Sequence, residues 1–82
     1  MIAAQISYYP LNSGNINEEV DEVLSIIQTY DLGVKTNEMS TIVAGETAKV
    51  YQMLQEITES MQSRDQEFVM NVTLSTSCSW SP

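Results

Sequence analysis

The sequence contains no histidine, one cysteine and only three basic residues. Without histidine it has no catalytic triad and no histidine-ligated zinc site, and Cys78 alone cannot form a Cys-x-x-Cys motif or an internal disulfide. A single unpaired thiol is typical of a reducing compartment, so we predict a cytoplasmic location. The three glycines are widely spaced and form no phosphate-binding loop. Together these absences predict that the protein is not an enzyme.

Positive charge is also scarce. The net charge is −8, from eleven acidic and three basic residues, and Lys35, Lys49 and Arg64 are scattered along the chain. Nucleic-acid binding and attraction to anionic membranes both need clustered positive charge. No apolar run approaches the length of a membrane span, and we expect no signal peptide before Ile2. We therefore predict no nucleic-acid partner and no membrane partner.

The length predicts one small domain over residues 1–78, followed by a tail over residues 79–82. A chain of 82 residues buries only roughly 60 to 65% of its unfolded surface, so a monomer would be marginal. The composition, 43% hydrophobic and 17% charged, is nevertheless that of a folded domain. These totals favour association between copies as a source of additional burial.

Two segments have the periodicity of amphipathic helices. The first begins near Ile16, where Asn15 or Asn17 can cap it, and ends near Tyr30. The second covers residues 46–63. Apolar stripes are expected to face the core: Ile16, Val20, Val23, Leu24, Ile27 and Tyr30 in the first, and Val50, Met53, Leu54, Ile57 and Met61 in the second. The carboxylates Glu18, Glu19, Asp21 and Glu22 are expected on or beside the solvent face of the first helix.

Residues 2–9 and 68–78 alternate as strands do, because successive side chains in a strand point to opposite faces. One row is largely apolar and is expected to meet the helices: Ile2, Ile6, Tyr8, Phe68, Met70, Val72 and Leu74. The other row carries uncharged hydrogen-bonding groups: Gln5, Ser7, Tyr9, Asn71, Thr73 and Ser75. Residues 10–14 are expected to form a loop, since Pro10 cannot donate to a strand ladder. Residues 33–37 and 39–44 are expected to form a hairpin that turns at Asn37-Glu38.

The resulting order is β-α-β-β-α-β, which predicts an α+β, ferredoxin-like fold with a four-stranded antiparallel sheet and two helices on one face. In the usual strand order, 4-1-3-2, the first and last strands are neighbours. Their polar rows would then form one polar field on the open face of the sheet. Asn71, Ser7 and Thr73 offer hydrogen bonds there, and Tyr9 offers an aromatic face, which suits a flat, nitrogen-rich ring. The alternative is that these residues face only solvent or a second copy of the chain.

Three stretches, residues 5–11, 35–45 and 69–78, resemble the YkoF-like proteins that bind thiamine or hydroxymethylpyrimidine. The resemblance implies a ferredoxin-like domain that binds thiamine or its pyrimidine moiety without chemistry and without another cofactor. It also implies that single units associate, here as a homodimer or homotetramer. Within these stretches four residues match family-like positions: Ser7, Ser40, Thr41 and Asn71.

The leading hypothesis places the aminopyrimidine ring on the polar field, or at an oligomer interface that includes it. Asn71, Thr41 and Ser7 are expected to hydrogen-bond the edge of the ring. Other side chains are expected to complete the site: Tyr9 or Met39 over a face of the ring, Asn37 or Glu38 near the thiazolium, and Ser40 and Thr73 beside them. The alternative is an oligomeric protein-interaction module with no small-molecule ligand.

Overall fold

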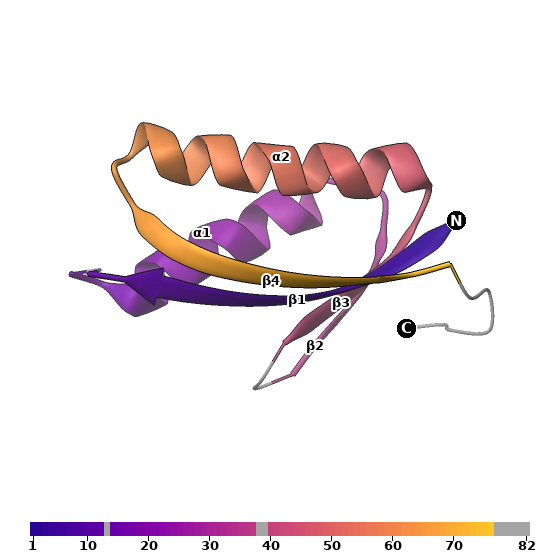
Figure 1. Ribbon diagram of the computed structural model, residues 1–82, viewed down its shortest axis with the longest axis horizontal. Helices are drawn as coiled ribbons and strands as arrows, with labels where there is room; N and C mark the ends of the chain where they lie inside the picture. The colour runs from indigo at the N-terminus through magenta and orange to yellow at the C-terminus, as the bar shows by residue number, and fades with distance from the viewer. Residues whose placement is uncertain (13, 38–39, 77–82) are drawn as a thin grey trace.

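The computed structural model of the protein describes residues 1–12, 14–37 and 40–76 (Figure 1). The predicted site residues Glu38 and Met39, the thiol Cys78 and the tail over residues 79–82 lie outside the described residues. Six elements follow one another in the predicted order: β1 (Ile2–Leu11), α1 (Ile16–Gln28), β2 (Gly33–Thr36), β3 (Thr41–Gly45), α2 (Thr47–Ser63) and β4 (Glu67–Ser75).

The sheet has the order β2-β3-β1-β4, and each neighbouring pair is antiparallel. Both helices lie on the same side of this sheet (Figure 1). The α+β, ferredoxin-like fold and the 4-1-3-2 strand order are therefore confirmed. None of the helices in the described part of the chain combines the length and the apolar composition needed to cross a bilayer.

The core lies between the helices and the sheet. The predicted stripes supply most of it, and its buried members are Ile2, Ala4, Ile6, Val23, Ile27, Val43, Val50, Met53, Ile57 and Met61. Two expected core residues are solvent-exposed instead. Ile16 in the first turn of α1 is 55% exposed, and Leu74 near the end of β4 is 42% exposed although it lies opposite the buried Ala4. The core thus thins towards both of these positions.

Several element boundaries differ from the predicted ones. β1 continues through Pro10 to Leu11 instead of ending in a loop. β3 pairs with β1 only as far as Ile6, so Pro10 lies where one side of β1 is an edge and a missing N–H is tolerated. α1 ends at Gln28, because Thr29 caps it by donating its hydroxyl hydrogen bond to the carbonyl of Ile26 at 2.7 Å. β4 ends at Ser75.

Candidate functional site

The polar rows of β1 and β4 are adjacent, as predicted. Ser7 lies directly opposite Asn71, and Gln5 lies opposite Thr73. Because directly opposite residues in an antiparallel pair share a face, these side chains lie together on the side of the sheet away from the helices. Tyr9 extends the row and is 49% exposed. We refer to Gln5, Ser7, Tyr9, Asn71, Thr73 and Ser75 as the polar field.

Thr41 does not belong to the polar field. It lies opposite Ile6, which is a core residue, so its side chain is on the helix-covered face. Thr41 is only 8% exposed. The expectation that Thr41, Ser7 and Asn71 hydrogen-bond one edge of the same ring is therefore wrong, because the sheet separates Thr41 from the other two.

Ser40 points the other way from Thr41. Its hydroxyl accepts a hydrogen bond from the side-chain amide of Gln5 at 3.2 Å, which ties the hairpin end to the polar field. Ser40 directly precedes β3, and its hydroxyl lies toward the polar field, whereas the side chain of Thr41 lies on the helix-covered face. The structure thus divides the predicted site residues between two faces.

A hollow of about 200 Å³ lies on the helix-covered face, between α1 and the end of the β2–β3 hairpin. We call it the hairpin pocket. Its apolar wall comes from Ile6 and Tyr8 of β1 and from Val20, Val23, Leu24 and Ile27 of α1, and its polar rim consists of Thr36, Asn37, Ser40 and Thr41. Three predicted site residues, Asn37, Ser40 and Thr41, therefore line this pocket, although the Ser40 hydroxyl bonds Gln5 of the polar field and the prediction put the ligand on the other face.

Asn37 fixes the shape of the polar rim. Its backbone N–H donates to the carbonyl of Ser40 at 2.9 Å, and its side-chain oxygen accepts from the backbone N–H of Ser40 at 2.8 Å. These reciprocal bonds close the hairpin, as expected of an asparagine at a turn. They also set the residue at which β3 begins, and hence the direction in which Thr41 points.

Tyr8 of β1 connects the hairpin pocket to a buried carboxylate. Its ring stacks on Phe68 with centroids 4.9 Å apart. Its hydroxyl donates to Oε2 of Glu19 at 2.5 Å. Burial raises the pKa of the Tyr8 hydroxyl, and the hydrogen bond to Glu19 and the charge of that carboxylate raise it further. Tyr8 is therefore a neutral hydrogen-bond donor at physiological pH.

Glu19 was expected on or beside the solvent face of the first helix, and this expectation is wrong. The residue is 5% exposed, and its Oε1 atom has no hydrogen-bond partner among the described residues. The signal was present in the sequence, because Glu19 precedes the buried Val23 and Ile27 at the helical spacing i, i+4, i+8. Glu18 and Asp21 of the same acidic group are exposed, as expected.

Comparison with known proteins identifies the family. Residues 1–80 match the family model described as the YKOF-related family. The chain belongs to the YKOF-related family. This confirms the resemblance that residues 5–11, 35–45 and 69–78 carry. No curated protein matches the chain.

Solved structures share the fold of this YKOF-related protein at low sequence identity. The hypothetical protein MJ1052 of Methanocaldococcus jannascii superposes with a TM-score of 0.82 at 20% identity, over 98% of this chain and 84% of that one. TM0486 of Thermotoga maritima, which has a proposed role in thiamine biosynthesis or salvage, has a TM-score of 0.80 at 17% identity, over 93% and 83%. SP2199 of Streptococcus pneumoniae has a TM-score of 0.80 at 22% identity, over 93% and 86%. These likenesses show the common fold.

Proposed function

We propose that this YKOF-related protein binds thiamine or its hydroxymethylpyrimidine moiety without catalysing a reaction, and that the pyrimidine ring occupies the hairpin pocket. The observation that carries the proposal is the pocket itself, in which the polar rim of Asn37, Ser40 and Thr41 meets an apolar wall. Family membership and the role proposed for TM0486 support the choice of ligand.

The chemistry of the pocket suits an aminopyrimidine. The ring has two apolar faces, which fit between the α1 side chains and β1, and an edge that both donates and accepts hydrogen bonds. At the rim, the Thr41 hydroxyl can both donate and accept a hydrogen bond. A buried ligand edge that meets such groups is recognised strongly, because each unmatched polar group in a dry site is costly.

The size of the pocket favours one ring. Pockets for drug-sized molecules usually measure about 300–1,000 Å³, whereas the hairpin pocket measures about 200 Å³. The pyrimidine would fill it, and the thiazolium ring of thiamine would extend from the mouth into the field of a chain with net charge −8. We therefore expect hydroxymethylpyrimidine to retain most of the affinity of the intact vitamin.

Two matched threonine substitutions test the location. Thr41→Val removes a hydroxyl from the hairpin pocket at constant shape, and Thr73→Val removes one from the polar field. Calorimetric titration with thiamine and with hydroxymethylpyrimidine should show that Thr41→Val weakens binding roughly 5- to 150-fold, as expected for one unmatched buried polar group. Thr73→Val should leave it unchanged. The reverse pattern would place the ligand on the polar field, and no heat or thermal shift with either compound would refute the proposal.

The exposed face of the sheet favours a second function, association with another copy of the chain as a homodimer or homotetramer. Tyr9, Leu11 and Val69 lie together at one end of this face and are 49%, 43% and 47% exposed. An exposed apolar cluster beside a polar row resembles the core and rim of an interface. Sedimentation equilibrium should show an oligomer that Val69→Lys dissociates. Leu74→Lys, an exposed apolar position on the opposite face, is the control. A wild-type chain that stays monomeric would refute the association.

A further inference from the structure

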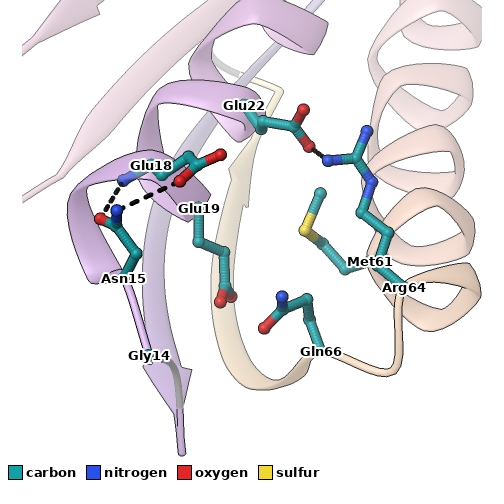
Figure 2. A pocket seen from close by; sticks show the side chains of 8 residues that line it. All are labelled: Gly14, Asn15, Glu18, Glu19, Glu22, Met61, Arg64 and Gln66. Carbon is teal, nitrogen blue, oxygen red and sulfur yellow. Dashed lines mark hydrogen bonds and ion pairs between the residues drawn. The ribbon is translucent and has the colours of Figure 1, made fainter.

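A second pocket lies between α1 and the end of α2, whereas the hairpin pocket lies between α1 and the hairpin. It measures about 310 Å³ and is enclosed by the start of α1, the end of α2 and the start of β4 (Figure 2). We call it the helix-end pocket. Its lining residues are Gly14, Asn15, Glu18, Glu19, Glu22, Met61, Arg64 and Gln66, and it shares none of them with the hairpin pocket.

The three carboxylates that line this pocket differ in their partners. Glu18 accepts a hydrogen bond from the side-chain amide of Asn15 at 3.1 Å. Glu22 forms an ion pair with Arg64. Glu19 extends into the space between these groups and Gln66, as Figure 2 shows. One of its oxygens accepts from Tyr8, and the other, Oε1, has no partner among the described residues.

A buried carboxylate oxygen without a partner is energetically unfavourable, because that oxygen has lost its hydrogen bonds to water and has no donor in their place. Glu19 is 5% exposed, so bulk water does not compensate. Tyr8 holds Oε2 from the sheet side, and Glu19 itself lines the pocket. The arrangement is therefore that of a preorganised acceptor.

We propose that the helix-end pocket binds a small organic cation that carries N–H donors, an ammonium or an amidinium, with Oε1 of Glu19 as the acceptor. The charge of the lining supports a cation, since Glu18, Glu19 and Glu22 outnumber the single guanidinium of Arg64. An N–H donor needs only one such oxygen. A metal ion needs several ligands, and the described residues contain no group of three or more His, Cys, Asp or Glu side chains that could hold one.

Benzamidine and benzamide are suitable probes, because they have nearly the same shape and differ in charge. Calorimetric titration of the full chain should show binding of benzamidine and no binding of benzamide. Glu19→Gln should weaken benzamidine binding about ten-fold or more, the size expected for one charge-assisted hydrogen bond. Asp21→Asn removes the same unit of charge from an exposed position of α1 and should change the affinity by less than about two-fold.

A second variant, expected to bind more tightly, keeps the test interpretable if Glu19→Gln fails to fold. Arg64→Gln removes the only cation of the pocket and should strengthen benzamidine binding, whereas an anion site would be weakened by the same change. Amide chemical-shift changes should cluster at Glu19 and Gln66 and spare Thr41, which separates this site from the proposed pyrimidine site. Equal binding of benzamide, unchanged affinity in Glu19→Gln or weaker binding in Arg64→Gln would each overturn the proposal and indicate a pocket filled only by water.

Discussion

Two tyrosine–glutamate hydrogen bonds of nearly equal length allow the effect of burial on a hydrogen bond's contribution to stability to be measured. Tyr8 donates to Glu19 at 2.5 Å, and Tyr30 donates to Glu56 at 2.6 Å. Glu19 is 5% exposed, whereas the second pair lies at the surface. Replacing each tyrosine by phenylalanine removes one hydroxyl and retains the ring. The two substitutions therefore compare the same bond in two environments.

The structure predicts very different losses of stability. In Tyr8→Phe the ring still stacks on Phe68, but Oε2 of the buried Glu19 carboxylate loses its donor, and Oε1 already has none among the described residues. A hydrogen bond to a charged group contributes about 1.5–3 kcal/mol to stability, so we expect the unfolding free energy to fall by about 2 kcal/mol. In Tyr30→Phe water replaces the lost donor, and we expect a change below about 0.5 kcal/mol.

Urea denaturation followed by circular dichroism measures the loss of unfolding free energy in Tyr8→Phe and in Tyr30→Phe. A double-mutant cycle then tests whether the loss in Tyr8→Phe comes from the contact between Tyr8 and Glu19. Glu19→Gln combined with Tyr8→Phe should show a coupling energy of about 1 kcal/mol or more, because the two groups are in direct contact. Similar losses for the two tyrosine variants would refute the reasoning. So would a coupling energy within about 0.3 kcal/mol of zero, which is the value expected of independent sites.

Three further predictions concern pH, the core and a helix cap. Burial and Glu19 raise the pKa of Tyr8 in the folded state, so the neutral hydroxyl contributes its full stabilisation at pH values below the pKa of about 10 in the unfolded chain. This contribution should be lost as the pH rises above 10. Urea titrations at increasing pH should therefore show a narrowing difference in unfolding free energy between wild type and Tyr8→Phe. Ile57 is fully buried, so Ile57→Ala should lower the unfolding free energy by about 2–5 kcal/mol in the same titration. Asn15 accepts from the backbone N–H of Glu18 at 3.1 Å, so Asn15→Ala should cost about 1 kcal/mol and speed amide exchange in the first turn of α1.

The fold was predictable because its signals are periodic. Alternation in residues 2–9 and 68–78, together with two stripes at helical spacing, leaves few topologies that bury every apolar row. The adjacency of the polar rows then follows from strand order alone, and the pairing of Ser7 with Asn71 bears this out. None of these inferences required knowledge of a particular side-chain contact.

The buried carboxylate was not predictable in the same way. Hydrophobicity favours Ile16 over Glu19 for the core, yet Ile16 is exposed and Glu19 is buried. The helical spacing of Glu19 to Val23 and Ile27 indicated the buried face, but the burial of Glu19 depends on a hydrogen-bond donor from another element. A hydrophobic pattern ranks residues one at a time, whereas the hydroxyl of Tyr8 is supplied across the core, eleven positions earlier in the chain.

The misplaced Thr41 and the misplaced Glu19 have a common physical origin. Periodicity states that neighbouring residues differ in the face they present, but it does not state which face a given residue takes; a shift of one position in a strand exchanges every side chain between the two faces. The reciprocal hydrogen bonds between Asn37 and Ser40 determine which face of the sheet the Thr41 side chain takes. The hydrogen bond from the Tyr8 hydroxyl lowers the free-energy cost of burying Glu19. Both proposed sites thus arise where a local polar contact, and not the hydrophobic period, determines where a side chain points. A search for function in small α+β domains should therefore begin at residues whose position contradicts the hydrophobic period and is determined by a local polar contact.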